Sequence, residues 1–267
     1  MARMLSIVTI CYLIPTAFVP SFPKQQQDPL IDIRALLDRL MEFSARNALA
    51  SAEAKGIYTD EALEWDFATF GKLTEFPDKT VLVDRNNAIA RYQLSSDNGL
   101  IVDVYIYMTK QGAWKIKSVR RLALTGGLEA VQFALKARTD STKQERDLLA
   151  NIELTLATDK MLRTWLVTNK TLVEQLRDLS LSVSAPKSRL ITDDNNGFPG
   201  ITSLLRQLHL RGVATKENGN VEIVIGGVLD NTVGYIYSPT ERPPKMDDTN
   251  YFWIEKVMDK WYLFRTT

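Results

Sequence analysis

Apolar and polar residues alternate from Asn87 to Val119, and this pattern predicts three consecutive antiparallel strands. Asn98-Gly99 lies between the first two apolar runs, and both residues tolerate the positive φ of a two-residue type I′ turn. The outgoing run, Leu100 to Met108, has an apolar residue at every second position. A turn at Lys110 to Gly112 then leads into the third strand, Ala113 to Val119. The stretch therefore predicts a β-meander.

The alternation also assigns the two faces of this meander, because neighbouring side chains of a strand point to opposite sides. The apolar face is expected to join a core and carries Ala88, Ala90, Tyr92, Leu94, Leu100, Val102, Val104, Ile106 and Met108. The other face is expected to meet solvent and carries Arg91, Tyr105, Tyr107, Lys115 and Lys117. Aromatic and basic groups on one face also suit base stacking. A solvated face is the simpler interpretation, and we expect no nucleic acid partner.

A second stretch near the C-terminus is similar to this meander. Asn231 to Tyr237 resembles Asn87 to Gln93, and Tyr251 to Arg265 resembles Val104 to Ser118, with a longer connection before the second segment. Internal similarity of this kind indicates a repeated structural unit. We therefore predict an α+β protein with two tandem domains, each made of helices packed on a curved antiparallel β-meander.

Helix signals precede each group of strands. Asp28 is followed by proline, the preferred start of a helix, and the apolar spacing predicts that this helix runs to about Ala54. Thr142 and Glu145 have the spacing of a capping box. Thr158-Asp159 allows a further helix start. These positions supply the helical layer that each predicted sheet needs.

These signals divide the chain into parts. We expect a helix-plus-meander domain at residues 28–125, a connecting helix at 126–141 and a second helix-plus-meander domain at 142–267. Apolar residues from Met161 to Leu179 recur at helical spacing and predict one long amphipathic helix in the second domain.

A turn followed by a tryptophan-containing strand, Gln111 to Ile116 (QGAWKI), gives the first domain a resemblance to the nuclear transport factor 2-like superfamily. Asp259 to Leu263 is a looser match. The resemblance implies a curved sheet backed by helices around a cone-shaped pocket, which Trp65, Tyr92 and Trp114 would line. The first domain contains no histidine, so the Asp/His pairs of some enzymes of that superfamily do not carry over.

Four large apolar residues follow one another in the second domain: Tyr251, Phe252, Trp253 and Ile254. Consecutive apolar side chains point to both sides of a strand, so we expect this strand to be covered on both faces. The cover is either the other domain or a second subunit, which we favour, or a bound ligand.

The N-terminal 22 residues predict the cellular location of the protein. Arg3 precedes an apolar run that stops near Pro20, and no acidic residue occurs before Asp28. This arrangement is typical of a secretory signal peptide at residues 1–22, with an uncleaved N-terminal anchor as the alternative. The only cysteine, Cys11, lies inside this segment, which suits export to an oxidising compartment, periplasmic or extracellular.

Composition excludes several kinds of chemistry. Lys plus Arg (33) nearly cancel Asp plus Glu (32), so no overall charge favours nucleic acid or acidic membranes. His209 is the only histidine, which argues against zinc sites and histidine-dependent nucleophiles. Asp193 to Gly197 begins like a calcium loop but lacks the later glutamate, and reads as an exposed turn. We expect no metal, no cofactor and no catalytic residue.

One enzymatic alternative remains open. Glu61, Glu64 and Asp66 lie beside Trp65, and a carboxylate facing an apolar pocket would have a raised pKa suited to acid or base catalysis. A solvated helix face is the simpler interpretation. The sequence therefore predicts an exported, non-enzymatic binding or assembly module whose partner is an unknown protein or a second copy of the chain. The alternatives are a carrier or sensor of a small apolar ligand and a carboxylate-dependent enzyme.

Overall fold

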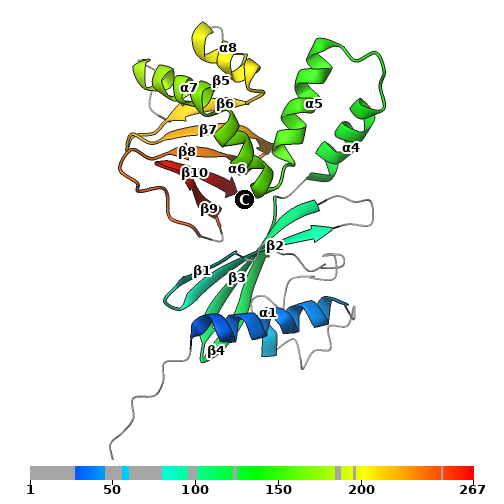
Figure 1. Cartoon of the computed structure of the whole chain (residues 1–267), viewed down its shortest axis with the longest axis vertical. Helices are drawn as coiled ribbons and strands as arrows, with labels where there is room; N and C mark the ends of the chain where they lie inside the picture. The colour runs from blue at the N-terminus through cyan, green and yellow to red at the C-terminus, as the bar shows by residue number, and fades with distance from the viewer. Residues whose placement is uncertain are drawn as a thin grey trace, which may run out of the picture.

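The computed structural model describes residues 28–45, 56–59, 80–95, 101–122, 125–183, 188–194, 197–247 and 249–267. It is an α+β structure with two antiparallel sheets and associated helices (Figure 1). The expected signal peptide, the acidic residues 61, 64 and 66, and Trp65 lie outside the described residues. No helix in the described ranges has the length and apolar character needed to cross a bilayer.

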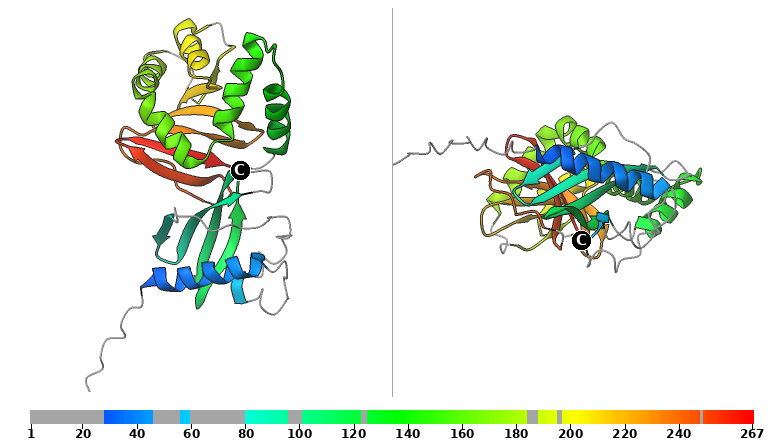
Figure 2. Two further views of the ribbon diagram at one scale, coloured as in Figure 1. Left: turned by 45° about the vertical axis from the view of Figure 1, so that its right-hand side comes forward. Right: turned by 90° about the horizontal axis from the view of Figure 1, so that it is seen from below.

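The first sheet is a four-stranded meander in the order β1-β2-β3-β4. Its strands are Thr80–Asp84, Asn87–Ser95, Ile101–Gln111 and Ala113–Arg120. Helix α1, Pro29–Ala45, lies across one face of this sheet (Figures 1 and 2). The sheet prediction from the alternating pattern is confirmed.

The core of the first domain forms between α1 and the apolar face of this sheet. The helix begins where Asp28 Oδ1 accepts a hydrogen bond of 3.0 Å from the Leu30 amide. Full burial of one aliphatic side chain contributes about 1.5–3 kcal/mol, so a stripe of several such residues holds the helix on the sheet. The buried residues of this core are Ile33, Leu36, Leu37, Leu40, Ile57, Tyr58, Ala88, Ala90, Tyr92, Ile106, Met108, Trp114 and Ile116.

The predicted turn at Asn98-Gly99 lies outside the described residues, and the pairing of β2 with β3 shows the register of the strands on either side of it. Ser95 pairs with Ile101, so the described pairing is centred on position 98. Paired residues share a face, and a slip of one residue would turn the apolar face of β3 away from that of β2. Burial of the core face decides the register here.

The second sheet has six strands in the order β5-β6-β7-β8-β10-β9. Its strands, in chain order, are Ile191–Thr192, Gly212–Thr215, Val221–Val228, Asn231–Tyr237, Tyr251–Met258 and Trp261–Thr266. Strand β10 lies between β8 and β9, so the second sheet is not the simple meander that we expected. The long connection from β8 to β9 allows β9 to take the outer position, and the expected repeat does not extend to strand order.

Five helices accompany the second sheet: α4 (Thr125–Lys136), α5 (Lys143–Thr155), α6 (Asp159–Thr168), α7 (Lys170–Ser182) and α8 (Pro199–Gln207). The predicted capping box of Thr142 and Glu145 is present at the start of α5. The single long helix predicted from Met161 to Leu179 is wrong, because α6 ends with Asn169 as its C-cap and α7 begins there. The buried faces of α6, α7 and α8 share one core with β7, β8 and β10.

The first sheet with α1 and the second sheet with its helices, which we call the first and the second domain, meet where the second face of the first sheet covers β9 and the start of α6 (Figures 1 and 2). This contact overturns the expectation that Arg91, Tyr105 and Tyr107 face solvent, since all three are buried. Lys115 and Lys117 do stay partly or fully exposed. The alternating pattern identified the two faces of the sheet correctly, but it could not show that a second domain covers the polar one.

Candidate functional site

An aromatic cluster forms the apolar part of the interface between the domains. The Tyr105 ring centre lies 5.2 Å from that of Phe252 and 4.8 Å from that of Trp253. Such distances are those of favourable tilted ring pairs. Ile89 and Tyr107 complete the cluster. The structure thus places two of the four residues expected to be covered, Phe252 and Trp253, against the other domain.

The other two residues of that run lie in a neighbouring cluster of the second domain, packed with Ile236, Tyr262 and Phe264. There the Tyr251 hydroxyl donates a hydrogen bond of 2.5 Å to Glu222 Oε1, while Ile254 is buried.

Tyr107 supplies a hydrogen-bond donor to backbone carbonyl groups near the edge of the second sheet. Its hydroxyl donates to the carbonyl oxygen of Phe252 and lies 3.1 Å from the carbonyl oxygen of Asp247. Strand β9, which contains Phe252, is the last strand of its sheet and pairs only with β10, and Asp247 lies in the connection that precedes it. A side chain of the first domain therefore closes this part of the edge.

Asp159 is the centre of a buried charge network beside this cluster. It is the first residue of α6 and is fully buried. Its carboxylate accepts hydrogen bonds from Tyr105 (2.7 Å), Arg265 Nε (2.9 Å) and Arg91 Nη1 (3.3 Å). Its backbone amide donates a hydrogen bond of 2.5 Å to Asp103 Oδ2. The first and second domains thus contribute partners to the same carboxylate.

The network continues toward the surface and is balanced in charge. Arg91 Nη1 lies 2.9 Å from Glu255 Oε2, and Glu255 Oε1 lies 2.5 Å from Arg163 Nη1. Arg265 also approaches Asp103, at 3.8 Å, and donates a hydrogen bond of 2.8 Å to the Ala157 carbonyl. Three arginines therefore face three carboxylates, namely Asp103, Asp159 and Glu255. This balance is what burial of charge requires.

Burial changes the protonation of the network. It raises the pKa of Asp103, as does the charge of Asp159, while Arg265 and hydrogen bonds from the Asp159 amide and Gln93 act against this rise. Burial also keeps the pKa of the Tyr105 hydroxyl well above its usual range, so this group remains a hydrogen-bond donor. Burial opposes the charge of Arg265, yet the carboxylates of Asp159 and Asp103 raise its pKa. These are the properties of a sealed structural contact.

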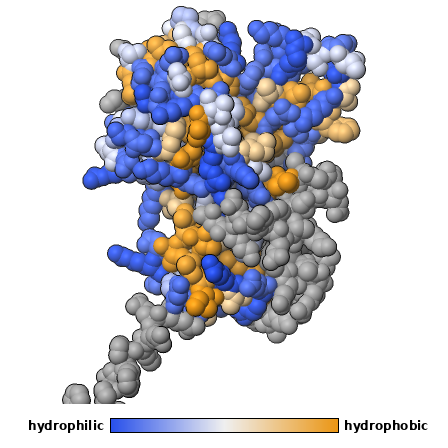
Figure 3. Space-filling model, in the orientation of Figure 1, coloured by the Kyte–Doolittle hydropathy of each residue, from blue (hydrophilic) through white to orange (hydrophobic). Residues whose placement is uncertain are grey.

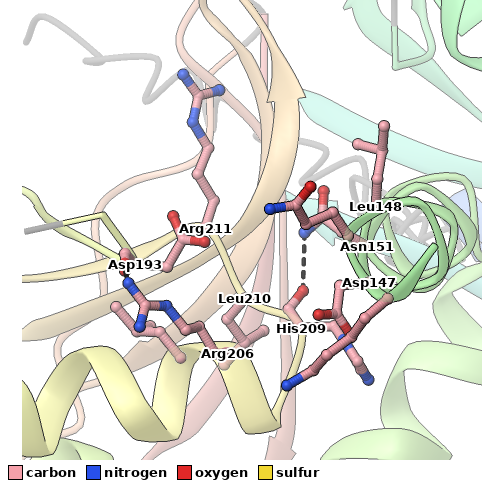
Figure 4. A pocket seen from close by; sticks show the side chains of 11 residues that line it. Asp147, Leu148, Asn151, Asp193, Arg206, His209, Leu210 and Arg211 are labelled. Atoms are coloured by element: carbon pink, nitrogen blue, oxygen red, sulfur yellow. Dashed lines mark hydrogen bonds and ion pairs between the residues drawn. The ribbon is translucent and has the colours of Figure 1, made fainter.

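A second polar region, which we call the α5/α8 groove, is open to solvent (Figure 4). It has a volume of about 600 Å³ and lies between α5 and the turn that connects α8 to β6. The lining residues are Lys143, Gln144, Asp147, Leu148, Asn151, Asp193, Leu205, Arg206, His209, Leu210 and Arg211. The volume lies within the range of ordinary ligand sites.

Asn151 fixes the two walls of the α5/α8 groove relative to each other. Its amide nitrogen donates hydrogen bonds to the carbonyl oxygens of His209 (2.8 Å) and Ile225 (2.7 Å) (Figure 4). The helix approaches β7 closely at Gly226, where an added Cβ would lie 2.1 Å from Thr155 Oγ1. Only glycine permits this approach. The hydrogen bonds of Asn151 and the close approach at Gly226 therefore fix the position of α5 relative to the His209 turn and β7.

His209 shapes the groove through its backbone. It has a φ of 54°, in the left-handed region that ends helices, and so turns the chain from α8 into β6. Its Nδ1 lies 3.7 Å from Asp147 Oδ1, which is too long for a hydrogen bond. This geometry gives no activated base. The structure also shows no group of metal-ligating side chains within the described ranges.

The cations of the groove lack the partners that the interdomain network provides. Among the described residues, Lys143, Arg206 and Arg211 have no carboxylate within 4.0 Å. Arg206 Nη2 donates a hydrogen bond of 2.6 Å to the backbone carbonyl of Asp193, which leaves its other nitrogens available. The wall of the groove thus presents positive groups with unused donors.

Two of the three residues expected to line a cone-shaped pocket occupy the core of the first domain, and the third, Trp65, lies outside the described residues. Tyr92 and Trp114 are buried between the sheet and α1, and burial raises the pKa of Tyr92. Asp193 is exposed in a turn, as expected, and also lines the α5/α8 groove.

Sequence reasoning missed the role of Asp159, Arg265 and Arg206. The helix start at Thr158 was predictable, but a single charged residue in a strand or helix carries no signal of its distant partner.

Comparison with protein-family models, curated proteins and solved structures gave no match for this chain. Its function is therefore argued from its own geometry.

Proposed function

We propose that the protein is an exported, non-enzymatic binding module whose α5/α8 groove takes up a short acidic segment of a partner protein. One observation supports this most strongly: Lys143, Arg206 and Arg211 line one groove without carboxylate partners, while the arginines buried between the domains are fully paired. Arginine forks and lysine ammonium groups recognise carboxylates. An acidic segment would supply the missing partners.

The rest of the groove favours a polypeptide over a small inorganic anion. Leu148 is partly exposed at its wall, and apolar side chains of Leu205 and Leu210 lie behind it. Asp147 and Asp193 give the groove acceptors for backbone amides. A segment that carries acidic residues around one apolar residue matches this mixture. In this proposal the interface between the domains keeps the groove on a single rigid support, and residues 1–22 direct export.

A display library of acidic random peptides tests the proposal. We expect selection on the full chain to enrich peptides with carboxylates beside an apolar residue. Arg206→Ala should weaken the binding of these peptides about tenfold, because loss of a charge-assisted contact costs roughly 1.4 kcal/mol or more. Isothermal calorimetry measures the change.

Lys170→Ala is the matched control, because Lys170 is a cation of the same domain that already pairs with Glu174 at 3.8 Å outside the groove. Its peptide affinity should equal that of the unmodified chain. Enriched peptides that bind Arg206→Ala and the unmodified chain equally, or a library that yields no enrichment, would overturn the proposal.

A second candidate function is carriage of a small apolar ligand by the first domain, as in the superfamily that its sequence resembles. One observation favours it: the Trp114 indole nitrogen is buried and has no hydrogen-bond partner among the described residues. Buried donors are rarely left without a partner. A ligand acceptor would satisfy it.

Native mass spectrometry on protein exported by its own host tests this second function. An excess mass that disappears on denaturation, and that is lost in Trp114→Phe, would support carriage. A bare mass would remove the candidate and leave the groove as the binding site.

A further inference from the structure

Strand β1 forms an open edge of the first sheet. It pairs with β2 on one side only, and no hydrogen bond from a described residue reaches its outer side. The unpaired amides and carbonyls of such an edge are a template for another strand. Natural edges are usually protected by charged residues, proline or a bulge, and in β1 the only such residue is Asp84 at its end, which leaves Val81, Leu82 and Val83 without one.

The other sheet edges of the molecule are shorter or covered. Strand β4 forms a bridge with Tyr58, whose neighbour Thr59 donates its amide to the Ile116 carbonyl at 2.9 Å. Strand β9 is covered by Tyr107 of the first domain. Strand β5 has only two residues. Among the described strands, β1 is therefore the edge best suited to accept a partner strand.

The side chains of β1 leave both neighbouring cores unfinished at this edge. Val81 packs against the α1 core, and Val83, which lies on the same face, is 38% exposed. On the opposite face, Leu82 pairs with Ile89 of the interdomain cluster and is 37% exposed. Apolar residues also gather over the first sheet and α1 in the surface view (Figure 3). A partner strand at β1 would extend both cores at once.

A second copy of the same strand fits this edge. In an antiparallel pair centred on Leu82, each leucine would face its copy, and Val81 would face Val83 of the partner subunit on the α1 side. Each face would then meet a face of its own kind, and no charge would be enclosed within these pairs. We propose that two copies of this chain associate through β1 and join their first sheets into one continuous eight-stranded sheet. This inference is independent of the groove and its ligand.

Light scattering coupled to size exclusion, across a dilution series of the full chain, measures this association. We expect the unmodified chain to pass from monomer to dimer as its concentration rises. Leu82→Lys should weaken the dimer about tenfold or more, because it places two like charges opposite each other on one face of the joined sheet. Leu229→Lys is the matched control, since Leu229 is 79% exposed in another hairpin, and it should dimerise like the unmodified chain.

Leu82→Cys in a Cys11→Ser background keeps the test decisive should Leu82→Lys fail to fold. The proposal requires a disulfide between the two Cys side chains at position 82, visible as a dimer on a non-reducing gel, and no such dimer from Leu229→Cys. A chain that stays monomeric at every concentration, or equal cross-linking at both positions, would overturn the proposal.

Discussion

The interdomain network and the α5/α8 groove contain the same kinds of side chain in opposite conditions. In the network, Arg91, Arg163 and Arg265 each contact a carboxylate, and water is excluded from its centre at Asp159. In the groove, the described cations remain open to solvent without a carboxylate partner. Paired charge closes a contact within the chain, whereas unpaired charge in a concave surface leaves a contact to be made by another molecule.

The difference follows from the cost of desolvation. A buried charge without a partner costs several kcal/mol, so the interface tolerates arginines only together with their carboxylates. At the rim of a groove, water solvates a cation at little cost until a ligand replaces it. The same residue type therefore stabilises the fold in one place and remains available for binding in the other.

The largest effect is expected from Asp159→Ala. This change removes the carboxylate from Tyr105, Arg91 and Arg265 and leaves buried guanidinium groups unpaired. We expect a loss of about 3–5 kcal/mol in the free energy of unfolding, measured by urea denaturation. Asp193→Ala, in the groove, is the control and should leave the urea midpoint unchanged. A loss of equal size in both variants would remove the contrast between the two regions.

Asp103→Asn should alter the pH dependence of stability. Because burial raises the pKa of Asp103 in the folded state, the native protein binds this proton more readily than the unfolded chain. The stability gained from this proton is fully present below the unfolded pKa of about 3.9. It is lost as pH rises through the folded pKa, by at most about 1.36 kcal/mol of unfolding free energy per pH unit.

The stability of the unmodified chain, relative to Asp103→Asn, should therefore fall as pH rises above about 4. Urea midpoints for both proteins over this range measure the effect. A difference that is constant with pH would contradict the assignment.

Tyr107→Phe tests the closure of the β9 edge. The change leaves the carbonyl groups of Phe252 and Asp247 without this donor, and we expect it to cost about 1–2 kcal/mol. Tyr262→Phe is the comparison, because Tyr262 is a largely buried tyrosine of the second sheet whose hydroxyl makes no hydrogen bond with a described residue. Tyr107→Phe should unfold at a lower temperature than Tyr262→Phe. The reverse order would argue against an edge closed by Tyr107.

The smallest effect on stability is expected in the groove. Arg211→Ala should leave the urea midpoint of the free protein nearly unchanged, because no carboxylate of a described residue pairs with this side chain and its one hydrogen bond, to the Gly227 carbonyl at 3.4 Å, is long and exposed. It should nevertheless weaken binding of a selected acidic peptide. A clear loss of stability would show that Arg211 has a structural role instead.

Local pattern predicted much of the fold. The alternation in β2, β3 and β4, the capping box at Thr142 and the helix start at Thr158 depend on residues near one another in the chain, and each is present. The continuous helix predicted from Met161 to Leu179 was wrong, because packing decides where a helical pattern is interrupted, here at Asn169. The same reason explains β10, whose place between β8 and β9 depends on tertiary contacts.

The site was harder to predict than the fold. The covered run at Tyr251 to Ile254 pointed toward the interface, because apolar groups on both faces of a strand require cover. Arg91 and Asp159 are 68 positions apart in sequence, and nothing in their surroundings marks them as partners. The groove cations were equally invisible, since their significance lies in the absence of neighbours that only the folded chain can show.

Side-chain NMR of the arginines tests the contrast between paired and unpaired charge most directly. The probe is acetyl-Glu-Leu-Glu-Leu-amide, added to the full chain while the Nε–Hε signals are followed. We expect saturable shifts of the Nε–Hε signals of Arg206 and Arg211, while the signals of Arg91 and Arg265 do not move. Shifts of equal size at all four arginines, or none in the groove at saturating peptide, would contradict it.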